Sequence, residues 1–293
     1  MRLAIFSRFL KTEHLPVAQE LFDLLARKNI ALFIFKDYYQ TFNNQLLISQ
    51  KIETFANHQE LKQQNVDFVI TLGGDGTILE AATLVRNLEI PIMGINLGRL
   101  GFLAMIEKHR LALAIDALEM NAFVLDSRSV LHLESADNLF EDNNFALNDF
   151  TIVKRDTSSM VIIHTYLNGE FLNSYWADGI IIATPTGSTG YSLSCGGPII
   201  FPNSSNFVIT PVAPHNLNVR PLIIADDGVL SFEIEGRGEN FLCTLDSRYR
   251  TIKAHTQLAI KKADFKVRLV RFSDRNFLYM LRQKLHWGVD SRN

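Results

Sequence analysis

Val69-Ile70-Thr71-Leu72-Gly73-Gly74-Asp75-Gly76-Thr77-Ile78-Leu79 is the stretch around which the fold is organised. Residues 66–72 form a β-branched, apolar run that ends in glycines, which is typical of a buried strand. From Ile78 onward apolar residues recur at helical spacing, so the glycines join this strand to a helix N-terminus. Glycines permit positive φ angles and expose backbone N–H groups, and a helix N-terminus attracts phosphate. The stretch therefore predicts a strand–loop–helix unit with an anion-binding loop.

Asp75 adds a carboxylate to this anion-binding loop. Next to phosphate, a carboxylate is favourable when it binds a metal, accepts the proton of a hydroxyl group, or hydrogen-bonds sugar hydroxyls. The alternative is a tight turn that needs glycine, in which Asp75 only caps the helix. The loop by itself leaves both interpretations open.

Composition excludes several classes of protein. The 293 residues suffice for two domains, and a hydrophobic content of 47% is ample for their cores. A net charge of -2 gives no support to nucleic acid or an anionic membrane as partner. The apolar runs are far shorter than the roughly 20 residues that span a bilayer. Two cysteines make no disulfide framework, and no Cys/His cluster has metal-ligand spacing. We expect a soluble, cytoplasmic protein.

The first part of the chain alternates strands and helices. Apolar runs predict strands over 3–6, 30–35, 66–72 and 91–96, and helical spacing predicts helices over 16–25, after 77 and over 109–120. The spacing of Ile48, Ile52 and Phe55 predicts a further helix. This alternation is typical of a Rossmann-like parallel sheet, in which ligands bind beyond the carboxyl ends of the strands. We assign residues 1–126 to an α/β nucleotide-binding domain, to which a helix over 277–285 returns with residues 272–293.

The second part, residues 127–271, is predicted to be all-β and sandwich-like. Turns rich in Asn, Asp and Gly separate short apolar runs, which is typical of antiparallel sheets. The expected strands are 129–133, 150–154, 161–167, 179–184, 207–211, 229–235 and 241–245.

Thr184-Pro185-Thr186-Gly187-Ser188-Thr189-Gly190-Tyr191 is a second candidate binding loop. It follows a buried strand, and its hydroxyls and backbone groups suit an adenine edge, ribose hydroxyls or phosphate oxygens. Asp178 precedes that strand. The alternative is a Ser/Thr-rich surface hairpin. A third motif, Asn148-Asp149, is by itself ordinary turn chemistry.

Together the three motifs resemble the NAD kinase family of bacterial type, in order and in spacing. The glycine–aspartate loop alone also resembles phosphofructokinases and diacylglycerol or sphingosine kinases, whereas its combination with the Thr-Pro-Thr-Gly-Ser-Thr loop is specific. The resemblance covers nearly the whole chain, because it extends to Asn96–Leu103, Pro214–Leu217, Arg220-Pro221 and Leu285–Gly288.

The resemblance implies transfer of the γ-phosphoryl group of ATP to the 2′-hydroxyl of the adenosine ribose of NAD, which gives NADP. It implies a two-domain fold with the site between the domains and a β-rich, NAD-binding second domain. ATP would bind with Mg²⁺ or another divalent cation, without an identified set of metal ligands. The resemblance further implies homo-oligomers, commonly tetramers.

The same resemblance assigns the site residues. Asp75 is the catalytic residue, which accepts the proton of the ribose hydroxyl. The residues implied to bind NAD are Gly74, Asp75, Gly76, Asn148, Asp149, Asp178, Thr186, Thr189, Gly190, Tyr191, Ser192, Ser194 and Asp246. Three positions depart from the family pattern: Asp149 stands where many relatives carry Glu, Gly190 where Ala is usual, and Trp176 where a basic or small residue is common.

Two further interpretations share part of this pattern. One is a lipid or sugar kinase with the same glycine–aspartate loop, and the other is a dinucleotide-binding sensor without turnover. The chain contains no Walker-type Gly-Lys-Ser/Thr sequence and no Gly-x-Gly-x-x-Gly after its first strand, which excludes P-loop kinases and ordinary dehydrogenases as templates. Trp176 either covers the nucleotide or packs inside the protein. The loop residue His215 is a candidate to line the site.

Overall fold

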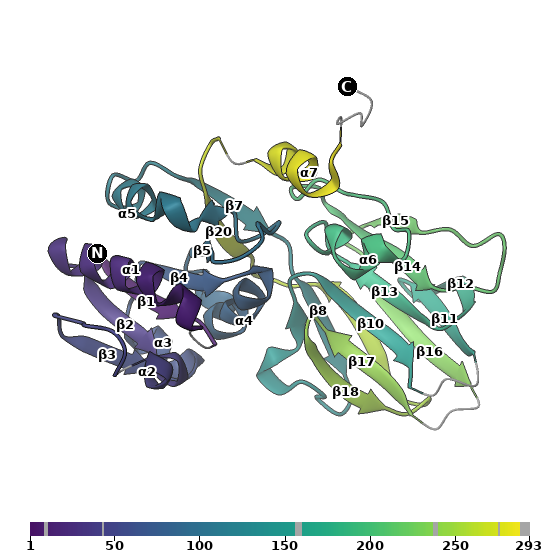
Figure 1. The fold of residues 1–293 in the computed structure, drawn as a ribbon. Helices are drawn as coiled ribbons and strands as arrows, with labels where there is room; N and C mark the ends of the chain where they lie inside the picture. The colour runs from purple at the N-terminus through teal and green to yellow at the C-terminus, as the bar shows by residue number, and fades with distance from the viewer. Residues whose placement is uncertain (9–10, 43, 156–159, 237–239, 275, 288–293) are drawn as a thin grey trace. The chain divides into compact units, whose positions relative to one another are not determined.

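The computed structural model describes residues 1–8, 11–42, 44–155, 160–236, 240–274 and 276–287. The chain forms two compact units (Figure 1). Unit 1 consists of Met1–Ser127 and Val267–Asn293, and unit 2 of Arg128–Lys266. Residues 267–271, which the sequence analysis placed in the second domain, form a strand of the sheet in unit 1.

Unit 1 contains an eight-stranded sheet in the order β3-β2-β1-β4-β5-β20-β7, with β6 beside β5. Neighbouring strands from β3 to β20 run parallel, as the alternation of strands and helices predicted. The order 3-2-1-4-5 is that of Rossmann-like sheets, so this prediction is confirmed. The strands are β1 Arg2–Phe6, β2 Ala31–Phe35, β3 Ile52–Phe55, β4 Phe68–Gly73, β5 Ile92–Asn96, β6 Ile106–Glu107, β7 Val124–Arg128 and β20 Val267–Arg271.

Helices cover this sheet, and apolar side chains at helical spacing attach them to it. In α1, for example, Ala18, Leu21 and Leu25 are buried at intervals of three and four residues. Helix α1 packs against α5, and α3 packs against α4. The helices of unit 1 are α1 Leu15–Arg27, α2 Lys36–Phe42, α3 His58–Gln63, α4 Asp75–Val85, α5 Leu111–Glu119 and α7 Phe277–Leu285.

The predicted C-terminal helix is confirmed as α7. The side chain of Asn276 caps its N-terminus by accepting a hydrogen bond from the backbone N–H of Tyr279 (2.9 Å). The ring of Phe277 contacts that of Phe102, with 6.1 Å between centroids, and Met280 and Leu281 are buried. The helix therefore belongs to unit 1.

The helix predicted from Ile48, Ile52 and Phe55 is wrong. Ile52–Phe55 form the edge strand β3, which pairs in parallel with β2. Glu53 and Thr54 are both exposed in this strand, so it shows no alternation of apolar and polar residues. The spacing of its two apolar ends therefore resembled a helical repeat.

Unit 2 contains two six-stranded antiparallel sheets, in the orders β15-β14-β13-β10-β17-β18 and β12-β11-β16-β19-β8-β9. Phe150 and Ile182 from the first sheet share a core with Ile163 and Phe232 from the second, which confirms the predicted sandwich-like domain. The strands are β8 Leu131–Ser135, β9 Phe145–Ala146, β10 Asp149–Lys154, β11 Val161–Leu167, β12 Glu170–Ala177, β13 Gly179–Ala183, β14 Asn206–Val212, β15 Leu222–Ala225, β16 Leu230–Gly236, β17 Phe241–Leu245, β18 Arg248–Ile252 and β19 Leu258–Lys262. The short helix α6, Tyr191–Ser194, follows β13.

Candidate functional site

The glycine loop joins β4 to α4, as the sequence predicts. None of its glycines has a positive φ angle, so left-handed backbone is not the reason for them. A Cβ on Gly73 would lie 2.1 Å from Oγ1 of Thr77, which requires glycine at this position. Gly74 and Gly76 have no heavy atom within 4 Å of an added Cβ, so their backbone is open to a ligand. The loop thus presents bare N–H groups at a helix N-terminus.

Asp75 is the first residue of α4, and its carboxylate does not cap the helix. It accepts hydrogen bonds from three successive backbone N–H groups of another loop. Phe102 donates to Oδ2 (2.8 Å), and Leu103 and Ala104 donate to Oδ1 (3.0 and 2.9 Å). A Cβ on Gly101 would lie 1.9 Å from Oδ1, so only glycine leaves room for this contact. The interpretation of Asp75 as a mere cap is therefore wrong.

A cavity of about 420 Å³ in unit 1 lies at the carboxyl ends of β1, β4 and β5. Gly74 and Gly76 line it, together with the basic residues Arg8, Lys11, His14 and Arg99. Glu80 is the carboxylate among its lining residues and pairs with Arg8. Burial raises the pKa of Glu80, against the effect of Arg8. The basic side chains and the helix N-terminus suit a polyanionic ligand such as a triphosphate.

In unit 2, the hydroxyls of the Thr-Pro-Thr-Gly-Ser-Thr loop mostly hold the loop itself. Thr184 Oγ1 donates to the carbonyl of Leu147 (2.6 Å) and accepts from the N–H of Gly187 (3.1 Å). Ser188 Oγ donates to the carbonyl of Pro185 (2.7 Å) and accepts from the N–H of Ile200 (3.0 Å). The loop is therefore not a loose surface hairpin, because it is fixed by buried hydrogen bonds.

Three residues predicted to bind NAD, in this loop or directly after it, have side chains that form hydrogen bonds inside the protein. Arg128 donates to Thr186 Oγ1 (3.1 Å), and Thr189 Oγ1 donates to the carbonyl of Thr186 (3.2 Å). Ser192 is fully buried, and its hydroxyl hydrogen-bonds that of Thr210 (2.8 Å). The structure therefore places the Ser192 side chain in the interior, away from any ligand surface.

Asn148 and Asp149 face the backbone of Gly190. An added Cβ on Gly190 would lie 3.2 Å from the carbonyl oxygen of Gly187, 3.7 Å from Asp149 Oδ2 and 3.8 Å from Asn148 Nδ2, so an alanine here would fit tightly against the Gly187 carbonyl. Asn148 Oδ1 is buried, and in the described part of the chain it has no hydrogen-bond partner. A buried acceptor of this kind can take a hydrogen bond from a bound ligand. Next in sequence, Tyr191 is 43% exposed, and Ser194 is also exposed.

Asp149 has a strongly altered acidity. Burial, together with the nearby charge of Asp246, raises its pKa to about 7. Burial also raises the pKa of Asp246, but three backbone N–H groups and Arg248 oppose this rise. Of the two carboxyls, Asp246 is therefore the ionised one, and Asp149 holds its proton up to near neutral pH.

Asp149→Asn is expected to change how stability depends on pH. Because the pKa of Asp149 is about 7 in the folded chain and 3.8 ordinarily, the unfolded wild type loses this proton first. As pH rises from about 4 to 7, the free energy of unfolding of the wild type should therefore fall relative to that of the variant. Above about pH 7, the two free energies should change with pH in the same way. Urea melts of both proteins between about pH 4 and pH 8 check this. A constant difference across that range would contradict the assignment.

Sequence reasoning did not identify Lys154, which forms an ion pair with Asp178 (2.6 Å). Lys154 ends β10, the strand that begins at Asp149, and no motif marks it. Trp176 is 46% exposed, so it does not pack in the interior, and its carbonyl accepts from the N–H of His215 (2.8 Å). His215 is exposed as well.

Across the described ranges, no group of three or more His, Cys, Asp or Glu side chains is placed to hold a metal ion. Nor does this part of the chain contain a helix long and apolar enough to cross a bilayer.

Comparison with known proteins matches both units. The family model of the ATP-NAD kinase N-terminal domain matches residues 3–122, and that of the C-terminal domain matches residues 147–272. An NAD kinase of Cytophaga hutchinsonii is 47% identical over 296 residues, and one of Bacteroides fragilis is 42% identical over 292. Each of these alignments covers 100% of both chains.

Solved structures share the fold at lower identity. Yeast NADH kinase complexed with NADH has a TM-score of 0.85 and 21% identity, over 99% of this chain and 88% of the yeast chain. An NAD kinase of Archaeoglobus fulgidus in complex with ATP has a TM-score of 0.75 and 22% identity, over 98% of this chain and 100% of its own. With the matching family models and the full-length relatives, the conclusion is that the chain belongs to the NAD kinase family.

Proposed function

We propose that the chain transfers the γ-phosphoryl group of ATP to the 2′-hydroxyl of the adenosine ribose of NAD. The O2′ atom forms a bond to the γ-phosphorus while the bond from this phosphorus to the β,γ-bridging oxygen breaks, so NADP and ADP result. The hydroxyl proton passes to the carboxylate of Asp75. The observation that carries the proposal concerns the Asp75 carboxylate at the start of α4. Three backbone N–H groups of another loop fix its position.

The Asp75 carboxylate keeps a free hydrogen-bond acceptor position, which a general base needs. A carboxylate offers about four acceptor positions, and the three N–H groups use two on Oδ1 and one on Oδ2. One position on Oδ2 therefore remains for a ribose hydroxyl. A positioned base accelerates such a step by roughly 10²–10⁴-fold. The N–H groups also fix the orientation of the carboxylate before substrate binds.

The cavity in unit 1 is proposed to hold the phosphates of ATP. Arg8, Lys11 and Arg99 supply positive charge there, and the backbone of the glycine loop supplies donors. Mg²⁺ takes one or two carboxylates and completes its shell with phosphates and waters. Glu80, the carboxylate among the lining residues, would have to exchange its ion pair with Arg8 for such a contact. Mg²⁺ or another divalent cation supplies neutralisation of the phosphate charge when bound.

NAD is proposed to contact Gly74, Asp75 and Gly76 in unit 1 and a set of polar groups in unit 2. The unpartnered Oδ1 of Asn148, the protonated carboxyl of Asp149 and the exposed ring of Tyr191 support this assignment. Ser192 would contribute only its backbone. The other members of the set are Asp178, Thr186, Thr189, Gly190 and Ser194. For Asp246, family resemblance implies a direct contact with NAD, but its carboxylate is buried and accepts three N–H groups of the chain.

We further propose that the chain works in the cytoplasm as a homotetramer with Mg-ATP. Cys195 and Cys243 are free thiols, which suits a reducing compartment. The edge strand β15 exposes Leu222 and Ile223, and such edges pair readily with another chain. Light scattering during size exclusion should give four times the 33.2 kDa chain mass.

Release of ADP from Mg-ATP with different acceptors tests the proposed reaction. NAD, diacylglycerol and fructose 6-phosphate are offered separately at equal concentration, since kinases of lipids and sugars share the glycine–aspartate loop. We expect NAD to dominate. Faster ADP release with the lipid or the sugar phosphate would overturn the proposal. Binding of NAD without ADP release would indicate a sensor.

A further inference from the structure

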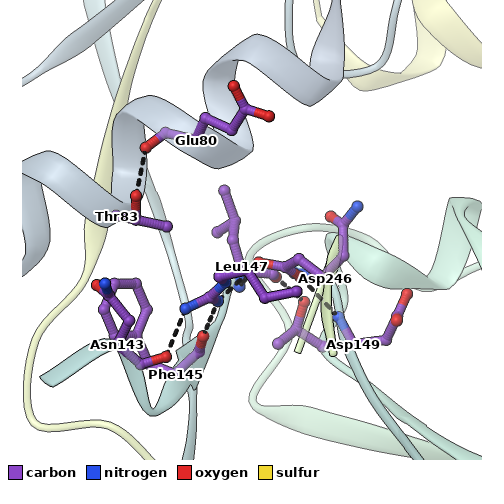
Figure 2. A network of polar contacts seen from close by, with 10 residues as sticks. Glu80, Thr83, Asn143, Phe145, Leu147, Asp149 and Asp246 are labelled. Atoms are coloured by element: carbon purple, nitrogen blue, oxygen red, sulfur yellow. Dashed lines mark hydrogen bonds and ion pairs between the residues drawn. The ribbon is translucent and has the colours of Figure 1, made fainter. Parts of the chain in front are cut away.

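The turn Leu147-Asn148-Asp149 is bound by a single buried carboxylate, that of Asp246 (Figure 2). The N–H of Leu147 donates to Oδ2 (2.9 Å), while those of Asn148 and Asp149 donate to Oδ1 (2.8 and 3.2 Å). Asp246 comes from the turn between β17 and β18, almost 100 residues further along the chain. One side chain thus satisfies three consecutive donors, which fixes the path of this turn.

The carbonyl groups of the same turn are also satisfied. Thr184 donates through Oγ1 to the carbonyl of Leu147 (2.6 Å) and through its N–H to that of Asn148 (2.9 Å). The N–H of Asp246 donates to the carbonyl of Asp149 (2.9 Å). A Cβ on Gly187 would lie 2.1 Å from the carbonyl oxygen of Asn148, so glycine is needed there. The backbone is therefore held from two sides, and the side chains are left for other contacts.

Arg248 extends this arrangement to the segment before the turn. Its guanidinium donates to the carbonyls of Asn143 and Phe145 and lies 5.3 Å from the centre of the Phe145 ring. It also lies 3.8 Å from Oδ2 of Asp246. The positive charge of Arg248 and the hydrogen bonds together offset the free-energy cost of burying the Asp246 carboxylate.

We propose that Asp246 is a positioning residue, which fixes Asn148 and Asp149 for NAD and does not touch NAD itself. The Asp246 side chain is 4% exposed, and its two oxygens already accept three N–H groups. The inference rests on the proposed function, because it takes Asn148 and Asp149 as NAD contacts. It assigns Asp246 a role different from the one that family resemblance implied.

Asp246→Asn tests the role, because its amide must turn an NH₂ group toward at least one N–H of the turn. We expect the KM for NAD to rise by about tenfold or more and the KM for ATP to stay within about twofold. In the Asn148→Ala background, the same substitution should raise the KM for NAD by a smaller factor than in the wild type, because the part of its effect that acts through Asn148 is already lost. Additive effects would instead support a direct contact of Asp246 with NAD and overturn the proposal.

Thr244→Val is the matched control. It removes the hydrogen bond between Thr151 and Thr244 (2.7 Å), which joins the same two strands, β10 and β17, two residues from Asp149 and from Asp246. We expect it to lower the melting temperature and leave the KM for NAD within about twofold. An equal rise of this KM in the control would reduce Asp246 to a stabilising residue.

Amide hydrogen exchange at residues 147–149 gives a readout independent of catalysis. Asp246→Asn should increase exchange there, while Thr244→Val should leave it unchanged. Failure of the proposed function would appear as a wild type that forms no NADP. Failure of this inference would appear as an active wild type whose Asp246→Asn variant keeps its KM for NAD and its protected amides.

Discussion

Asp75→Asn is expected to lower kcat for NADP formation by about 10²–10⁴-fold or more, because an amide accepts no proton from the ribose hydroxyl. The binding of NAD should change little, since the side chain keeps its size. An amide oxygen can still accept the N–H groups of Leu103 and Ala104, so the loop that Asp75 binds keeps most of its support. Steady-state kinetics with NAD and Mg-ATP, together with calorimetric titration of NAD, measure both quantities.

Asp67→Asn is the matched control for this substitution. Asp67 precedes β4, the strand that leads to Asp75, and its Oδ2 accepts the backbone N–H of Arg2 (2.7 Å). The change is chemically the same, but at the opposite end of the strand. We expect kcat to stay within about twofold. If Asp75→Asn retained more than about a tenth of the wild-type kcat, Asp75 would not be the base.

Gly101→Ala is expected to reduce kcat by about 10²-fold or more, although Gly101 itself carries no reactive group. The added Cβ would lie 1.9 Å from Oδ1 of Asp75 and 2.4 Å from its Cγ. Gly101 does not have a positive φ angle, so the backbone tolerates alanine and the whole effect falls on the carboxylate. Because the Asp75 side chain must move by about 1 Å to relieve this contact, the proton acceptor is misplaced.

Gly98→Ala is the control for that effect. It lies in the same loop, and an added Cβ there has no heavy atom within 4 Å. Because Gly98 lines the cavity proposed for the phosphates of ATP, we expect Gly98→Ala to raise the KM for ATP but to leave Asp75 in place. Crystal structures of both variants would show a displaced Asp75 only in Gly101→Ala. Full activity of Gly101→Ala would mean that the position of this carboxylate does not limit the reaction.

The sequence predicted correctly those helices and strands whose own residues show a clear apolar pattern. The β4–α4 unit followed from a buried run, three glycines and a helical repeat, and α7 matches the predicted range 277–285. The strand β3 was mistaken for a helix, because exposed Glu53 and Thr54 hide its alternation. The strand β18 was missed, since three of its five residues, Tyr249 to Thr251, are exposed.

The candidate site was predictable as a list of residues but not as a set of contacts. Asp75 stood out because a carboxylate in a phosphate loop needs a role, yet its three N–H donors come from a loop 27 to 29 residues further along the chain. Likewise, Asp246 reaches the turn at Asn148 only because β10 pairs with β17 in one particular register. Such contacts depend on tertiary pairing, which the spacing of residues in one sequence does not contain.

Formation of NADP from NAD and Mg-ATP by the wild-type protein, followed with an NADP-specific dehydrogenase, tests the central claim most directly. The account predicts one NADP for each ADP released, and loss of this product in Asp75→Asn. Absence of NADP from a folded wild type that binds NAD in calorimetry would contradict it and identify the chain as a dinucleotide-binding protein without turnover.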